Sequence, residues 1–175
     1  MTELFVWWLT LEIIGLVGLP LVAVTLANLP DRGWALSKPL SLLLLGWLIW
    51  FPLSALPVLP YTPAWIVATA LVFAAGNAAL LWRLPALRLS LRDLITRHRA
   101  HIIASECVFT GGFALMAWLR SFTSAVVDTE KFMDVAFLSS LWRTPHLPPP
   151  DPWLSGTTIN YYYYGHFLLA TIAKT

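Results

Sequence analysis

The sequence predicts an all-α integral membrane protein with four transmembrane helices, a partial fifth, and an extracytoplasmic loop that contains a short helix. Two observations lead to this prediction. Of the 175 residues, 58% are hydrophobic and only 11% are charged, whereas soluble domains average about 45–50% apolar and about 25% charged residues. Four apolar runs also reach or approach the roughly 20 residues that a spanning helix needs. The lipid bilayer is therefore the expected environment. Nucleic-acid binding is not expected, because the few basic residues lie beside the predicted spans.

The first three apolar runs make up the predicted N-terminal transmembrane region, residues 1–82. They cover Leu4–Leu29, Leu40–Leu59 and Ala64–Trp82. Glu12 lies inside the first run, where we expect a protonated or hydrogen-bonded packing residue in preference to a functional one. Pro52 and Pro57 are expected to bend or end the second span, because proline removes a helix hydrogen bond.

A basic connector, residues 83–101, precedes the fourth predicted span, residues 102–119. In the connector, leucines recur at helical spacing while arginines occupy other positions on the helical wheel. This pattern is typical of an amphipathic helix at the membrane interface. Glu106 lies one turn inside the fourth span, and we expect a structural pair with Arg99 or His101.

The distribution of Lys and Arg predicts the orientation in the cytoplasmic membrane. The loops 30–38 and 83–101 hold seven basic residues, and the connection 60–63 holds none. Basic loops are retained in the cytoplasm. The opposite loop, residues 120–160, is therefore expected to be extracytoplasmic, as is the whole Thr129–His166 segment.

This extracytoplasmic loop is where the acids cluster. Glu130 and Asp134 are four residues apart on a predicted helix that ends near Trp142, so that both carboxylates project from one face. The sequence PPPDPW then holds Asp151 in an extended segment, because residues before proline avoid the α region. Such carboxylates suit two kinds of chemistry, proton abstraction from a hydroxyl group and binding of a divalent metal ion.

A fifth predicted span begins at Tyr161 and has only residues 161–175. Fifteen helical residues rise about 22 Å, against a hydrocarbon thickness of roughly 30 Å. We therefore expect an N-terminal portion of a larger protein, or a subunit whose bundle another polypeptide completes. On a helix from Tyr161, Tyr162 and His166 would share one face. Tyr162 and Tyr164 are the tyrosines expected to face the protein, while the others suit a belt at the lipid headgroups.

Three ordered motifs in this region, TEKFMDVAFLSSL, PPPDPW and INYYYYGH, resemble the archaeal and chloroflexal YYY membrane proteins, an uncharacterised multi-pass family. The resemblance covers roughly residues 106–166. That family is in turn distantly similar to the GT-C-type membrane glycosyltransferases, which use polyprenyl-phosphate-linked sugars and carry catalytic acids in the first extracytoplasmic loop. This chain differs in having a fourth tyrosine and in ending before the further spans that the family usually has.

The resemblance implies a lipid-linked sugar transferase and a role for each residue of the loop. Asp134 is the expected catalytic base and Glu130 the second candidate. The expected substrate-binding residues, which would hold the phosphate or line the sugar and lipid pocket, are Lys131, Arg143, Tyr162, Tyr164 and His166. Asp151 is the candidate ligand of a divalent metal.

Two alternatives stay open at this stage. The three acids of the loop could form a structural clasp by pairing with Lys131, Arg143 and His146. The chain could then be a non-catalytic multi-pass subunit or scaffold within a larger complex. A transporter has less support, because Glu12 and Glu106 show no common path in the sequence.

The predicted orientation can be tested by cysteine labelling in a Cys107→Ser background. A Ser155→Cys variant should react with an impermeant thiol reagent in intact cells, and a Ser90→Cys variant should react only after the membrane is permeabilised. The reverse pattern would overturn the orientation.

Overall fold

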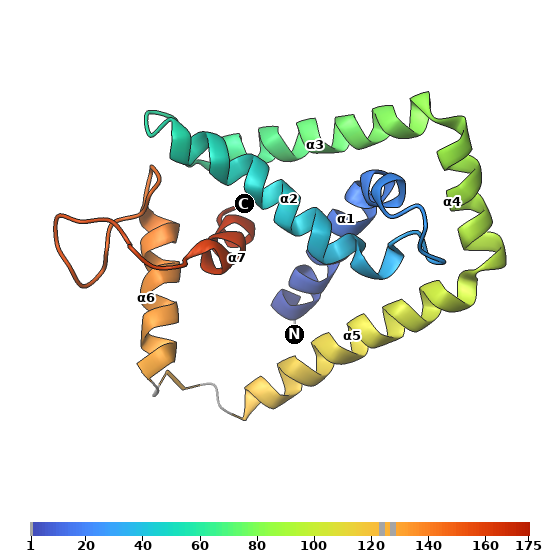
Figure 1. The fold of residues 1–175 in the computed structure, drawn as a ribbon. Helices are drawn as coiled ribbons and strands as arrows, with labels where there is room; N and C mark the ends of the chain where they lie inside the picture. The colour runs from blue at the N-terminus through green and yellow to red at the C-terminus, as the bar shows by residue number, and fades with distance from the viewer. Residues whose placement is uncertain (1, 123–124, 127–128) are drawn as a thin grey trace. The chain divides into compact units, whose positions relative to one another are not determined.

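A computed structural model describes residues 2–122, 125–126 and 129–175, and these residues form seven α-helices and no β-strand (Figure 1). In chain order the helices are α1 Thr2–Thr25, α2 Trp34–Ala55, α3 Pro63–Arg83, α4 Pro85–Arg97, α5 Arg99–Ser121, α6 Thr129–Arg143 and α7 Tyr164–Lys174. By length and composition, α1, α2, α3 and α5 can each cross a membrane. The prediction of an all-α membrane protein is confirmed.

The turn between α1 and α2 is shorter than the sequence predicts. Asp31 accepts hydrogen bonds from the backbone N–H of Gly33 (3.0 Å) and of Ala35 (2.9 Å). These bonds satisfy N–H groups that a helix start leaves without a partner. The helix α2 therefore begins at Trp34, six positions before the predicted Leu40, and includes Lys38, which the sequence analysis assigned to a loop.

The chain divides into two compact units. The first contains Met1–Leu42 and Val72–Ser124, and the second contains Leu43–Leu71 and Ala125–Thr175. The helices α2 and α3 contribute residues to both units.

In the first unit, glycines let α1 approach α2 closely. A Cβ atom added at Gly18 would lie 2.6 Å from the Cβ of Ser41 and 3.1 Å from the Cζ of Phe73. Small residues that allow such approach are a common basis of helix packing in membranes, where no hydrophobic driving force brings helices together.

The part of α1 around Pro20 is hydrogen-bonded to α3. Pro20 lies inside α1 and disturbs the local hydrogen-bond ladder. The backbone N–H of Leu21 donates to the side-chain oxygen of Asn77 on α3 at 3.0 Å, and the amide nitrogen of Asn77 donates in turn to the carbonyl of Phe73 at 3.0 Å. The buried amide side chain of Asn77 thus finds protein partners on both α1 and α3, as the absence of water in the membrane interior favours.

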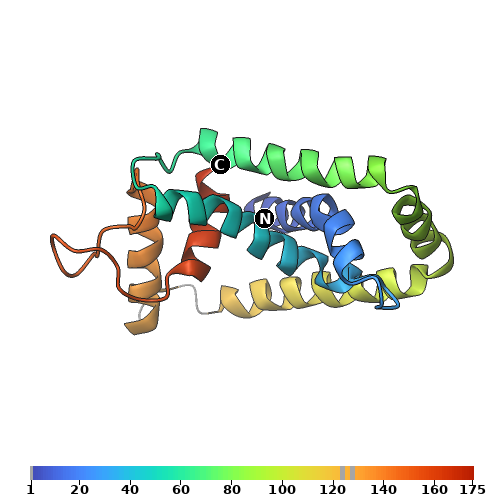
Figure 2. The same ribbon diagram turned by 45° about the horizontal axis from the view of Figure 1, so that its top comes forward.

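The basic connector is helical, as predicted. The helix α4 joins the end of α3 to the beginning of α5 (Figure 2). Leu87 and Leu94 are buried on one side of α4, and α4 packs against α1 and α5. Asp93 and Arg97 form an exposed ion pair of 2.8 Å on the same helix.

The second unit is built around α6 and α7, which pack against each other (Figure 1). Tyr61, before α3, is 1% exposed and lies at the centre of this packing. Its hydroxyl shares a hydrogen bond of 2.9 Å with Thr171 of α7, and its backbone N–H donates to the carbonyl of Pro145 after α6 (2.7 Å). Its ring lies 5.5 Å from that of Phe167 and 4.1 Å from the ammonium of Lys174. Tyr61 therefore ties the loop before α3 to both helices.

The glycine contact predicts a stability difference between two substitutions. Gly18→Ala should lower stability by about 1–3 kcal/mol, the usual range for overpacking, because the added methyl meets Ser41. Gly76→Ala is the control, since a Cβ there would meet nothing within 4 Å. Melting temperatures in detergent micelles measure both variants, and equal melting temperatures would contradict the packing.

Burial also predicts the titration of Tyr61. Burial raises the pKa of Tyr61 to about 12, against about 10 for an unperturbed tyrosine. The folded protein keeps the phenol proton to a higher pH than the unfolded chain. The stability that burial of this neutral phenol contributes is therefore fully present below about pH 10 and is lost as the pH rises towards about 12. The tyrosinate absorbance of the wild type minus that of Tyr61→Phe should titrate near the higher value. A difference that titrates near about 10 would show that Tyr61 is not buried.

Candidate functional site

The structure brings together two of the residues that the sequence analysis selected. Asp134 lies in the second turn of α6 and His166 in the first turn of α7. Their side chains meet at 2.8 Å, between Asp134 Oδ1 and His166 Nε2. The Asp134 side chain is 51% exposed and that of His166 is 19% exposed, so the carboxylate remains open to a reactant while the imidazole is largely enclosed.

The hydrogen bonding indicates the tautomer of His166. Its Nδ1 atom is buried and has no hydrogen-bond partner in the described structure. A buried N–H without an acceptor is costly, so the proton belongs on Nε2, which donates to Asp134. The imidazole then orients one oxygen of the carboxylate.

Phe137, one turn after Asp134 on α6, fixes the imidazole from the side. It is 4% exposed, and its ring meets that of His166 edge-on at 5.5 Å between centroids. Trp153 and Tyr161 also pack against the ring of Phe137, with ring centroids 5.6 and 5.9 Å from its centroid. Such edge contacts between aromatic rings are favourable, and they leave His166 little freedom to turn away from Asp134.

The proline-rich segment forms a narrow loop beside α6. Pro150 and Thr158 form an isolated antiparallel bridge, the Leu147–Pro148 peptide bond is cis, and the hydroxyl of Ser140 on α6 donates to the carbonyl of Pro150 at 2.6 Å. The loop is thus held to α6 by a direct hydrogen bond.

Asp151 stabilises the tip of this loop. Its Oδ1 atom accepts hydrogen bonds from the backbone N–H of Trp153 (2.8 Å) and Leu154 (3.0 Å), which is the ordinary use of aspartate at a turn. Across residues 2–122, 125–126 and 129–175, no group of three or more His, Cys, Asp or Glu side chains is arranged to hold a metal ion. The role of Asp151 as a metal ligand stays a prediction, and the surrounding side chains do not add to it.

The tyrosine run does not form one helix. The helix α7 begins at Tyr164, and Tyr163 is its N-cap residue, so the prediction that Tyr162 shares a helical face with His166 is wrong. A turn precedes the helix instead, in which the backbone N–H of Tyr163 donates to the carbonyl of Tyr161 at 2.9 Å. A local bond of this kind takes the place of the first helical turn.

The four tyrosines have different surroundings. Tyr162 is 80% exposed, and its ring lies 4.1 Å from that of Tyr161. Tyr163 accepts a hydrogen bond from the indole of Trp50 (3.2 Å), and Tyr164 donates to the carbonyl of Leu43 (2.8 Å). Tyr163 and Tyr164 therefore anchor α7 to α2. Tyr161 and Tyr162 are exposed, so the expectation that Tyr162 faces the protein is wrong.

The remaining candidates lie along α6. Glu130 is exposed in its first turn and Arg143 is exposed in its last. The Lys131 ammonium donates to the carbonyl of Ala125 at 3.3 Å. Their proposed parts in phosphate or proton chemistry stay predictions.

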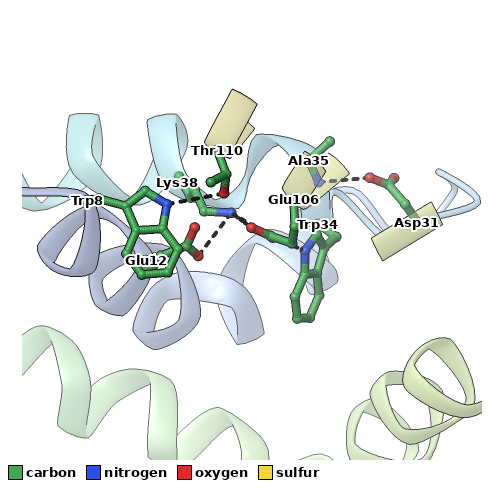
Figure 3. A network of polar contacts seen from close by, with 8 residues as sticks. All are labelled: Trp8, Glu12, Asp31, Trp34, Ala35, Lys38, Glu106 and Thr110. Carbon is green, nitrogen blue, oxygen red and sulfur yellow. Dashed lines mark hydrogen bonds and ion pairs between the residues drawn. The ribbon is translucent and has the colours of Figure 1, made fainter. Parts of the chain in front are cut away.

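A second polar cluster, in the first unit, was not predicted (Figure 3). The ammonium of Lys38 on α2 lies 2.7 Å from both carboxylate oxygens of Glu106 on α5 and 3.2 Å from Glu12 on α1. The indole of Trp34 donates to Glu106 at 2.6 Å, and that of Trp8 donates to Thr110 at 3.2 Å. We refer to Glu12, Lys38 and Glu106 as the triad.

The sequence contained a signal for the triad. Glu12 and Glu106 were recognised as ionisable residues within apolar runs, and such residues need partners. Glu106 pairs with Lys38 and not with Arg99 or His101, because the early start of α2 carries Lys38 into the helical bundle.

Comparison with known families matches residues 44–175 to the uncharacterised membrane proteins described as DUF2298. No curated protein and no solved structure matches the chain. The matched region is more than half of the 175 residues and includes both Asp134 and His166. The chain therefore belongs to the DUF2298 family of uncharacterised membrane proteins.

Proposed function

We propose that this chain carries the catalytic loop of a GT-C-like membrane glycosyltransferase that takes its sugar from a polyprenyl-phosphate carrier. The observation that supports this proposal best is the Asp134–His166 pair, in which an oriented imidazole holds a half-exposed carboxylate at 2.8 Å. Asp134 belongs to the TEKFMD motif and His166 to the YYYYGH motif. The pair therefore joins two motifs on which the resemblance to the YYY proteins rests.

In the proposed reaction Asp134 is the base. The acceptor hydroxyl attacks the anomeric carbon of the sugar, a new C–O bond forms, and the bond from that carbon to the phosphate oxygen breaks. The leaving phosphate keeps the electron pair, and the hydroxyl proton passes to Asp134. Because Oδ1 is held by His166, Oδ2 is the oxygen that meets the acceptor. A positioned base of this kind contributes about 10²–10⁴-fold to a rate.

Other residues have supporting parts in this proposal. Lys131 and Arg143 would balance the charge of the departing phosphate, and Glu130, one turn before Asp134, is the second candidate base. The exposed ring of Tyr162 would contact the sugar or lipid, whereas Tyr164 positions α7 through its bond to Leu43. No step is assigned to a metal ion.

The reaction would take place on the outer side of the cytoplasmic membrane. The basic loops favour this orientation, with the Thr129–His166 segment extracytoplasmic. The acceptor and the donor headgroup would then meet at the lipid interface.

A non-catalytic subunit is the second candidate, and a specific contact favours it. The Lys174 ammonium donates to the carbonyl of Thr144 at 2.8 Å, so that α7 is clasped to the end of α6 at a second place besides the Asp134–His166 pair. In a scaffold, the pair would serve only to hold the two helices together.

The decisive experiment measures sugar transfer from polyprenyl-phosphate donors in membranes that contain the protein. Asp134→Asn should lower kcat at least about 100-fold, because the amide cannot accept the proton. Asp93→Asn is the matched control, because Asp93 is a partly exposed acid on α4 and pairs only with its neighbour Arg97. Equal turnover by the wild type and Asp134→Asn would remove Asp134 from the role of base.

A second variant separates positioning from structure. His166→Asn should lower kcat by about 10–100-fold, an effect comparable to the loss of other groups that orient a functional side chain, while KM changes little. If the wild type transfers no sugar and both variants only lower the melting temperature, the subunit is the correct alternative.

A further inference from the structure

The triad places two acids and one base inside membrane-spanning helices. Glu12, Lys38 and Glu106 lie on α1, α2 and α5, three of the helices that can cross a membrane. Their side chains are 14%, 8% and 29% exposed. With every group ionised, the triad would carry one uncompensated negative charge. Uncompensated charge at such a place is costly.

The hydrogen bonds are unequally divided between the two acids. Glu106 receives two bonds from Lys38 at 2.7 Å and one from Trp34 at 2.6 Å. Glu12 receives only the longer contact of 3.2 Å from Lys38, through Oε2. Its other oxygen, Oε1, is buried and accepts no hydrogen bond in the described structure. The three N–H groups of the ammonium suffice for these contacts and for no more.

The two carboxyl groups share one cation. The Lys38 ammonium lies 3.2 Å from Glu12 Oε2 and 2.7 Å from Glu106 Oε1. One ammonium balances the charge of one carboxylate, so a proton on one of the two acids would remove the remaining negative charge. The unpaired oxygen of Glu12 is explained if Glu12 is the acid that holds this proton.

We propose that Glu12, Lys38 and Glu106 form an intramembrane proton-binding site, in which one proton on Glu12 balances the charge of the triad. The site then holds a neutral Glu12, a positive Lys38 and a negative Glu106. Release of the proton would leave two carboxylates, on α1 and α5, that share a single ammonium, and would weaken the packing of these helices.

Other charged groups near the triad are accounted for. On the side of α5, the ring of Phe109 lies 4.6 Å from the Lys38 ammonium. On α4, which packs against α1 and α5, Asp93 is paired with Arg97, and Arg88 and Arg92 are exposed. Among the described residues, the other ionisable side chains of α1 and α5 are all exposed. They are Glu3, Arg99, His101, Cys107 and Arg120. In the turn that precedes α2, the carboxylate of Asp31 accepts hydrogen bonds from two backbone N–H groups.

The position of Lys38 is fixed by a close helix contact. A Cβ added at Gly15 of α1 would lie 2.6 Å from Cγ of Lys38 and 3.1 Å from its Cα. The aliphatic part of the Lys38 side chain thus packs closely against α1, and its ammonium lies beside the two acids. This arrangement differs from a surface ion pair, whose partners are free to separate.

The first experiment detects the proton directly. Infrared spectroscopy of the chain in lipid nanodiscs should show, at neutral pH, the carbonyl stretch of one protonated carboxyl group, because exposed acids are ionised there. Glu12→Gln should remove this band, and Glu3→Gln, on an exposed face of the same helix, should leave it unchanged. Absence of the band in the wild type, or its persistence in Glu12→Gln, would overturn the proposal.

The second experiment separates the proton site from a fully ionised structural triad. If the folded state binds one proton more than the unfolded chain, the wild-type melting temperature falls as the pH rises above about 4, the ordinary pKa of a glutamic acid in an unfolded chain. Glu12→Gln, which imitates the protonated acid, should melt at least as high as the wild type at neutral pH and show no such fall. A fully ionised triad would instead lose an ion pair in this variant and melt lower. If Glu12→Gln does not fold, the proposal is wrong, since the amide keeps the size and charge of the neutral acid.

Discussion

A polar group in the hydrocarbon region gains stability from a partner inside the protein, because no water is present there to replace that partner. This constraint accounts for the contacts that hold the first unit together. Lys38 joins α1, α2 and α5 through two acids, and the side-chain oxygen of Asn77 on α3 accepts a hydrogen bond from the backbone N–H of Leu21 on α1. The glycines of α1 permit the close approach that these short polar contacts need.

Hydropathy predicted the four spanning helices, because the length of an apolar run and the thickness of the bilayer are directly related. It did not predict where α2 begins. The two hydrogen bonds of Asp31 decide that boundary, and their effect is to move Lys38 from a loop into a span. The partner of Glu106 was misassigned for the same reason, since a pairing across helices depends on the packing of α1, α2 and α5 and not on sequence distance.

Local patterns predicted α6 well, and they brought attention to both Asp134 and His166, but not to their contact. That contact depends on the packing of α6 on α7, which Tyr61 and Phe137 direct through side chains distant in sequence. The tyrosine run was less predictable. A helical wheel assumes that the helix is already formed at Tyr161, whereas the chain makes a turn there and begins the helix at Tyr164.

The Asp134–His166 pair and the triad place carboxyl groups in different environments, and the roles proposed for these groups follow from that difference. Asp134 is half exposed and its Oδ1 atom is held by His166, so in our proposal its other oxygen is the one that meets a reactant. Glu12 is nearly enclosed and shares a single ammonium with another acid, and in our proposal it is the acid that holds a proton. A carboxylate that must react needs access to solvent, and one that must store a proton needs to be shielded from it. Burial, not residue type, therefore assigns proton transfer to Asp134 and proton storage to Glu12 in our proposals.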